Sequence, residues 1–351
     1  MTPGSTTSID PALRIAEDEA PGLTGRGSLL EVQGLEVTFP TTLGPLKAVD
    51  DVSYSIAAGQ TLGVVGESGC GKSVAALAIL GLLPPPGAVT AGQVLFAGAD
   101  LVRLDPEALR RLRGDRLAMI FQDPLAALNP VVPIGDQVGE TLVIHRQVAP
   151  SLARKEAAAL LRRVGISDPD RRITEYPHQL SGGMRQRAVI AMALACRPAL
   201  LFADEPTTAL DVTVQAQILD LLDELRADTG LAMQFISHNL AVVSRLADEV
   251  VVMYAGRIVE RAPTNELFRH PAHPYTQALI NTVPVKGRRP LGSPPTKLSS
   301  IPGQVADMRT AGAGCRFAAR CPLVAYDCRA AEPPLRETGK NHWVACFRAA
   351  T

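Results

Sequence analysis

Four residues of the stretch GESGCGKS, residues 66–73, have the types and spacing needed to bind phosphate: Gly66, Gly71, Lys72 and Ser73. They match the pattern G-x-x-x-x-G-K-[ST]. Backbone N–H groups of such a loop converge on an anion, and the helix that follows adds its positive end. Lys72 can reach the β- and γ-phosphates of a nucleotide, and the Ser73 hydroxyl can ligate Mg²⁺. The alternative interpretation is a glycine-rich turn with an incidental lysine.

Two acids, Asp204 and Glu205, end the apolar run LLFADEP. In a phosphate-loop ATPase, the first acid at such a strand end binds Mg²⁺, and the next can position and polarise the attacking water. Acids that only cap a strand end are common. The phosphate loop upstream nevertheless favours the catalytic interpretation over that one.

A serine and two glycines open a second predicted helix in LSGGMRQR, residues 180–187. Ser181, Gly182 and Gly183 would form another anion-binding helix N-terminus. One nucleotide does not need two such sites, so this surface makes sense if it closes on nucleotide bound to a second subunit. A plain N-cap explains Ser181 equally well, but glycine in a first turn lowers helix stability by about 1 kcal/mol.

Strands and helices alternate along the chain in an order that can position these residues. The pattern predicts a strand-and-helix core, with two early strands that alternate as antiparallel strands do and a mostly helical insertion at 125–180. Strands are expected at 29–39, 48–56, 61–67, 92–98, 117–124, 199–206 and 232–238, a hairpin at 249–262, and helices at 73–83, 105–114, 151–166, 181–196 and 212–228.

Composition narrows the class of protein. Of the 351 residues 46% are hydrophobic, so the chain can bury a sizeable core. Lys+Arg and Asp+Glu both number 35, which argues against a nucleic-acid-binding stripe. No apolar run reaches the roughly 18 residues of a membrane span. Residues 1–27 have the composition of a disordered lead-in and not of a secretory signal, which predicts a cytosolic chain, and 284–303 read as a linker.

These motifs together resemble the nucleotide-binding subunit of an ATP-binding cassette (ABC) transporter, over residues 28–262. The resemblance implies a P-loop NTPase fold of the α/β class, with a RecA-like core, an antiparallel β subdomain and a helical subdomain. It also implies an ATPase that uses ATP and Mg²⁺. Residues 263–351 would form a small C-terminal cysteine-rich extension.

The resemblance also assigns a role to each motif. Phe39 would stack on adenine; Gly66, Glu67, Ser68, Gly69, Cys70, Gly71, Lys72 and Ser73 form the Walker A loop; Gln122 is the Q-loop glutamine; Ser181, Gly182, Gly183 and Gln186 belong to the signature that covers a partner's nucleotide; Asp204 and Glu205 are the Walker B aspartate and the catalytic glutamate; Asp211 is in the D-loop; and His238 is the switch histidine. Mg²⁺ would be held by Ser73, Gln122 and Asp204.

Within that family, the segments 121–137 and 270–284 and the C-terminal tail resemble the dipeptide/oligopeptide and nickel importers. The resemblance implies a peripheral subunit on the cytoplasmic face of the cell membrane that energises peptide uptake. Nickel, glutathione or another small solute remains an alternative cargo, and a non-transport ATP switch is the alternative of a different class. Implied partners are two transmembrane permeases, an extracytoplasmic substrate-binding protein and a second, paralogous ATP-binding subunit in a head-to-tail dimer.

Four cysteines, Cys315, Cys321, Cys328 and Cys346, cluster near the C-terminus. In a cytosolic chain such clustering favours metal over disulfides. The spacing is neither that of a zinc ribbon nor the standard ferredoxin run, and four thiolates suit either Zn²⁺ or an iron–sulfur cluster. The family resemblance favours a [4Fe-4S] cluster with a structural or redox-sensing role, and free or disulfide-linked cysteines remain a third possibility.

Overall fold

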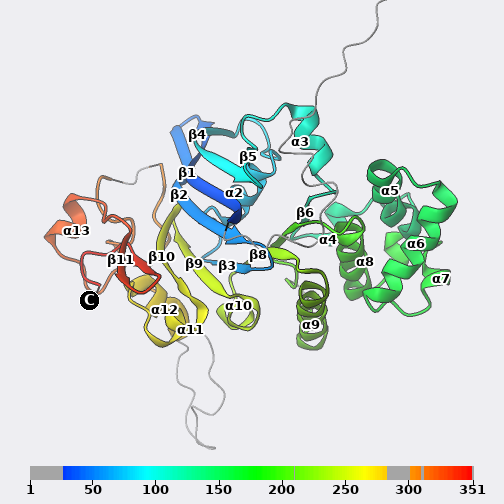
Figure 1. Cartoon of the computed structure of the whole chain (residues 1–351). Helices are drawn as coiled ribbons and strands as arrows, with labels where there is room; N and C mark the ends of the chain where they lie inside the picture. Colours follow the sequence, from blue (N-terminus) through cyan, green and yellow to red (C-terminus); the bar gives the residue numbers. More distant parts are fainter. Residues whose placement is uncertain (1–26, 209, 283–300, 310–311, 350–351) are drawn as a thin grey trace, which may run out of the picture.

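The computed structural model describes residues 27–208, 210–282, 301–309 and 312–349 (Figure 1). The predicted lead-in, apart from Gly27, and most of the predicted linker at 284–303 lie outside these ranges. Among the described residues we find no helix with the length and apolar character that a membrane crossing requires.

A four-stranded antiparallel sheet is built from the first third of the chain, in the order β2-β1-β4-β5. Its long strands bury one face and expose the other, as the alternation in the sequence predicts. The bounds are β1 Ser28–Thr41, β2 Gly44–Ala57, β4 Ala88–Phe96 and β5 Ala99–Asp100.

A larger, eight-stranded sheet carries the order β11-β12-β10-β9-β3-β8-β7-β6. Strands β9, β3, β8, β7 and β6 run parallel, and β3, β7 and β8 are buried along their whole length, which explains their continuous apolar sequences. The bounds are β3 Thr61–Val65, β6 Leu117–Ile120, β7 Leu200–Asp204, β8 Ala232–Ser237, β9 Glu249–Tyr254, β10 Arg257–Pro263, β11 Arg336–Gly339 and β12 His342–Val344.

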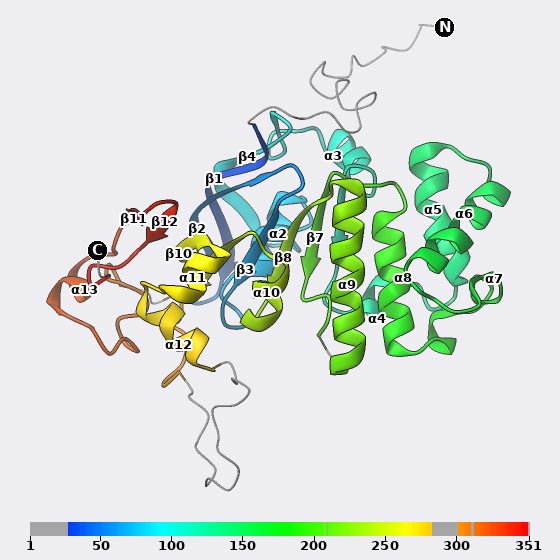
Figure 2. The same ribbon diagram turned by 60° about the horizontal axis from the view of Figure 1, so that its bottom comes forward.

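Helices α9 and α10 pack on this sheet, α2 contacts β1, β2 and β4 of the antiparallel sheet, and α5 to α8 form a lobe beside the two sheets (Figures 1 and 2). That lobe combines the helical insertion predicted at 125–180 with α8, the helix predicted at 181–196. The α/β class with its antiparallel sheet is confirmed. The bounds are α2 Lys72–Ile79, α3 Pro106–Leu112, α4 Pro124–Ala127, α5 Ile134–Arg146, α6 Pro150–Arg163, α7 Pro169–Arg172, α8 Gly182–Leu194, α9 Val212–Thr229, α10 Leu240–Leu246, α11 Thr264–Arg269, α12 Pro274–Thr282 and α13 Tyr326–Ala330.

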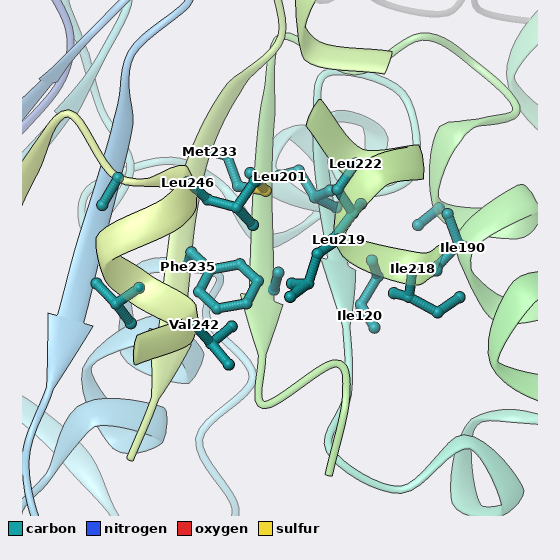
Figure 3. Close-up of a cluster of buried hydrophobic side chains, with 14 of the residues drawn as sticks. Ile120, Ile190, Leu201, Ile218, Leu219, Leu222, Met233, Phe235, Val242 and Leu246 are labelled. Carbon is teal, nitrogen blue, oxygen red and sulfur yellow. The ribbon is translucent and has the colours of Figure 1, made fainter. Parts of the chain in front are cut away.

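Side chains of α9 and α10 pack on the strands β6, β7 and β8 and form the centre of the core (Figure 3). Leu219 and Leu222 of α9 lie over Leu201 and Met233, while Val242 of α10 lies beside Phe235. All are buried. This layer holds the carboxyl ends of three neighbouring strands in a fixed arrangement, and the loops that follow those strands carry the predicted catalytic residues.

The C-terminal segment is attached to the same sheet, because β12 pairs with the edge of β10. Its large side chains also join the main core: Phe317 is buried against Tyr254 and Tyr275, with ring centroids 5.2 and 5.4 Å away. The C-terminal segment therefore shares the core of the cassette. The division at residues 262 and 263 stays a prediction.

Candidate functional site

The loop between β3 and α2 needs glycine at two of its positions. Gly66 has φ +156° and Gly71 has φ +102°. A Cβ atom would lie 2.2 Å from the carbonyl oxygen of Met253 at the first position, and 2.3 Å from that of Ala48 at the second. Neither position can hold a larger residue without moving backbone, so the pattern in the sequence reflects close packing as well as chemistry.

Lys72 and Ser73 are the first residues of α2. The Lys72 ammonium donates to the carbonyl oxygens of Gly66 at 2.8 Å and Glu67 at 3.0 Å. The Ser73 hydroxyl donates to Oδ1 of Asp204 at 2.9 Å. Hydroxyl and carboxylate oxygens side by side are ligands that Mg²⁺ prefers, so these two residues fit the predicted ion. Burial raises the pKa of Asp204 in spite of this hydrogen bond.

Glu205 lies at the centre of a hydrogen-bond network. Nδ1 of His238 is 3.1 Å from one carboxylate oxygen. The other oxygen accepts from the Thr208 hydroxyl at 2.8 Å and from the Gln122 amide at 3.3 Å. The structure thus brings together Gln122, Glu205 and His238, whose catalytic roles stay a prediction. It adds Thr208, which the sequence analysis did not name and whose signal is a hydroxyl three residues after the acid.

The carboxylate of Glu205 is held in its charged form. Burial acts to raise its pKa, but the hydrogen bonds from His238 and Thr208 outweigh burial, and the pKa is lowered. Its backbone has φ +46°, which is unusual for a residue other than glycine, while its N–H donates to the Ile236 carbonyl at 2.9 Å. A charged carboxylate fixed in this way can accept a proton from a water molecule or orient it.

Sheet topology explains why residues so far apart in sequence meet. Gln122, Glu205 and His238 each follow the carboxyl end of one of three adjacent parallel strands, β6, β7 and β8. Carboxyl ends of parallel strands lie at one edge of a sheet, which is where such folds bind ligands. Because the phosphate loop follows β3, the next strand in the order, it lies at the same edge.

The predicted signature residues lie in the helical lobe, and α8 is apart from α2 in both views (Figures 1 and 2). Ser181 is the N-cap of α8 and accepts from the Met184 N–H at 3.3 Å. A Cβ on Gly183 would meet Val214 in the first turn of α9 at 2.9 Å, whereas Gly182 has open space around it. The chain thus does not bring its own signature helix to its own phosphate loop.

Asp211 and Gln186 lie beside this surface. Asp211 caps α9, accepting from the N–H groups of Thr213 and Val214 at 3.0 Å each. Gln186 is buried, and among the described residues its side-chain nitrogen has no hydrogen-bond partner. The predicted D-loop and signature are therefore neighbours.

The remaining predicted nucleotide contacts differ in their surroundings. Phe39 is half-buried on β1 in the antiparallel sheet, and its ring lies against Gly87. Ser68 and Gly69 form the exposed top of the loop. Cys70 is fully buried with its sulfur 3.5 Å from the Lys72 ammonium, and burial raises the pKa of its thiol, so it is a packed and unreactive residue.

The four C-terminal cysteines are free thiols, and they share one neighbourhood. The Cys315 N–H donates to the Cys328 carbonyl at 2.8 Å, and Cys346 interacts electrostatically with Cys315 and Cys321. Burial raises the pKa of Cys315 to about 12. Within the described ranges, no group of three or more His, Cys, Asp or Glu residues is arranged to hold a metal ion, so the thiols do not present a formed cluster site.

Two family models match the chain. The model described as ABC transporter matches residues 49–208, and the model described as the C-terminal region of oligopeptide/dipeptide transporters matches residues 259–328. The second match begins in β10 and extends to Cys328, so it includes three of the four C-terminal cysteines.

Proteins with similar sequences match about nine-tenths of the chain. A dipeptide transport ATP-binding protein of Bacillus subtilis is 48% identical over 91% of this chain and 94% of its own length. The protein of the same name in Escherichia coli is 47% identical over 91% and 96%. Among solved structures, the ATP-binding cassette MJ0796 is described as a dimer in a post-hydrolysis state bound to ADP and Pi. It is 26% identical to this chain with a TM-score of 0.61, and the match covers 67% of this chain and 98% of that one.

Proposed function

Since the chain belongs to the family of ABC-transporter ATP-binding proteins that includes the dipeptide transport subunits, we propose that it hydrolyses ATP to drive the import of dipeptides or oligopeptides. The observation that carries this proposal is the network around Glu205, joined at one sheet edge to Lys72, Ser73 and Asp204. A protein that only bound ATP as a switch would not need such a carboxylate.

Each side chain has a distinct task in this proposal. Lys72 and the N–H groups of loop 66–73 other than that of Glu67 bind the β- and γ-phosphates, and Phe39 stacks on the adenine. Ser73 and Asp204 would hold Mg²⁺ together with Gln122, and the ion would supply positive charge to the phosphate oxygens. Glu205 orients the attacking water and takes its proton, while His238 and Thr208 keep the carboxylate charged and in place.

The signature surface is proposed to complete the site of a second ATP-binding subunit. Support comes from its place in the helical lobe, apart from the phosphate loop of its own chain, and from the dimeric state in the description of MJ0796. Ser181, Gly182 and Gly183 would then donate to the partner's γ-phosphate, with Asp211 and Gln186 beside them. We propose a paralogous partner in a head-to-tail dimer.

As an importer subunit, the chain works with membrane permeases. We propose two of them, an extracytoplasmic protein that delivers the peptide, and a position for this subunit on the cytoplasmic face of the membrane. The match of residues 259–328 to the oligopeptide/dipeptide C-terminal region supports peptides over other solutes.

A [4Fe-4S] cluster on Cys315, Cys321, Cys328 and Cys346 also remains a proposal, with Zn²⁺ as the alternative. The shared neighbourhood of the thiols supports it, while their arrangement does not yet form a ligand set. Anaerobic purification should give brown protein that absorbs near ~400 nm with about four irons per chain. Colourless protein with one zinc would favour the alternative, and metal-free protein would exclude both.

The proposed function is tested with Glu205→Gln in the complete transporter. We expect ATP binding close to wild type and a turnover at least about 100-fold lower, because a general base contributes about 10²–10⁴-fold. Peptide uptake into vesicles should fall with turnover. Glu224→Gln, on the exposed face of α9, is the matched control and should behave as wild type. Near-normal turnover in Glu205→Gln would contradict the assignment.

A further inference from the structure

Glu67, the second residue of the phosphate loop, is bound by an arginine that lies 253 residues further along the chain. Nη1 and Nη2 of Arg320 donate to the two carboxylate oxygens of Glu67 at 2.6 and 3.0 Å. This is the two-pronged geometry that makes an arginine–carboxylate pair both strong and directional. The arginine side chain is only 4% exposed and the Glu67 side chain 27%, so the pair is largely but not fully shielded from water.

Arg320 is itself fixed from several sides. Its Nε donates to the Pro302 carbonyl at 2.8 Å, and Nη2 lies 3.3 Å from the Ile301 carbonyl. The guanidinium also stands over the rings of Tyr254 and Phe317, 5.8 and 6.0 Å from their centroids. Because the side chain is already ordered, little further entropy is lost when it pairs with Glu67.

The backbone of Glu67 has a second anchor. Its N–H donates to the hydroxyl of Tyr275 on α12 at 2.8 Å. Tyr275 is fully buried and its ring packs edge-on against Tyr254, with centroids 4.7 Å apart. The Glu67 carbonyl, in turn, accepts from the Lys72 ammonium at 3.0 Å. A continuous line of contacts thus leads from Arg320 and Tyr275, through Glu67, to the lysine that the proposed function places on the phosphates.

We propose that Arg320 and Tyr275 are positioning residues of the nucleotide site: by holding Glu67 at its side chain and its backbone, they set the phosphate loop in the shape that binds ATP. The inference rests on the proposed function. It assigns the C-terminal segment a part in nucleotide binding, although its cysteines are far in sequence from every nucleotide motif. Cys315 and Cys321 lie on either side of Phe317 and Arg320 in the sequence.

The experiment measures the affinity of the full-length chain for a fluorescent ATP analogue, and the thermal midpoint of the same samples. Arg320→Gln should weaken binding about tenfold, the order expected when one charge-assisted pair is lost. Arg320→Lys keeps the charge and loses the two-pronged geometry, so its affinity should lie between those of wild type and Arg320→Gln. Tyr275→Phe, which removes only the hydroxyl, should also weaken binding.

Glu67→Gln combined with Arg320→Gln tests whether the pair acts as a unit. The double variant should bind the ATP analogue no more weakly than the weaker-binding single variant does, because the effects of substitutions at two residues in contact are not additive. Arg309→Gln is the matched control: Arg309 pairs with Asp307 at the surface of the same segment and should leave affinity unchanged. Affinity within about twofold of wild type in all Arg320 and Tyr275 variants, with only the midpoint lowered, would overturn the inference.

Lys72→Ala separates the two proposals. If it abolishes binding while the Arg320 and Tyr275 variants bind as wild type does, the nucleotide site stands and the positioning role falls. If Lys72→Ala binds as wild type does, the proposed site is wrong and the inference falls with it.

Discussion

His273 should make the protein less stable as the pH falls from neutral to about 5. The residue is 1% exposed, and Nδ1 of its ring accepts from the Tyr275 N–H at 3.0 Å. The backbone N–H of His273 donates to the buried carboxylate of Glu260 at 2.9 Å. A proton on Nδ1 would turn this acceptor into a donor that faces another donor. Burial lowers the pKa of His273 to about 4.

The sign and size of the effect follow from the two pKa values. In the unfolded chain the pKa of His273 is 6.5, so the imidazole binds a proton as the pH falls through that value. In the folded chain the same imidazole stays neutral until about pH 4. Stability is therefore full above pH 6.5 and is lost toward pH 4. One pKa unit corresponds to about 1.4 kcal/mol, so the loss is about 2 kcal/mol at pH 5 and about 3.4 kcal/mol once the pH is below both values.

Urea unfolding measures the free energy of unfolding at each pH. It is followed by the fluorescence of Trp343, the single tryptophan, which lies in β12. The comparison is wild type against His273→Asn at about pH 7.5 and pH 5. Asparagine can accept from the N–H two residues ahead, as the histidine does, and does not titrate. His270→Asn removes an exposed histidine and is the control. Equal pH dependence in wild type and His273→Asn would refute the reasoning.

Three further variants test other parts of the structure. Gly71→Ala should abolish nucleotide binding in a titration while the chain still folds, because its Cβ would meet the Ala48 carbonyl at 2.3 Å; normal affinity would contradict this. Ser181→Arg should block turnover at the partner's nucleotide and leave this chain's own ATP binding intact, which subunit-specific cross-linking to ATP can decide. His342→Ala removes the imidazole 2.7 Å from the fully buried Glu260 and should lower the free energy of unfolding by about 3–5 kcal/mol in chemical denaturation; a loss below about 1 kcal/mol would contradict it.

The part of the site that the sequence predicted is the part encoded by short local patterns. Gly66, Lys72, Asp204 and Glu205 each stand at the end of a strand or the start of a helix whose apolar sequence is visible without the structure. The order of strands in a parallel sheet then brings these ends together. The helical lobe was predicted for the same reason, since its amphipathic and alanine-rich stretches are long.

The contacts of Arg320 and Tyr275 with Glu67 could not be predicted in that way. They join residues 253 and 208 positions apart, and nothing in the sequence around either one distinguishes it from a surface arginine or a core tyrosine. The pairing of β12 with β10 was missed as well, because three residues, His342–Val344, are too few to show alternation. Both depend on how the C-terminal segment returns to the cassette.

The pairing of β12 with β10 also affects how the chain folds during its synthesis. Strand β10 is the edge of the cassette's sheet until β12 pairs with it, and β12 begins only at His342, long after β10 ends at Pro263. Ribosomes release the cassette well before they release this strand, so a nascent chain exposes an open sheet edge with unpaired backbone groups, of the kind that invites aggregation. Completed β11, short and bearing Arg336 and Glu337 at its exposed edge, ends that exposure. We therefore expect a stop codon that removes His342–Val344 to lower the yield of soluble protein far more than its distance from the nucleotide motifs suggests.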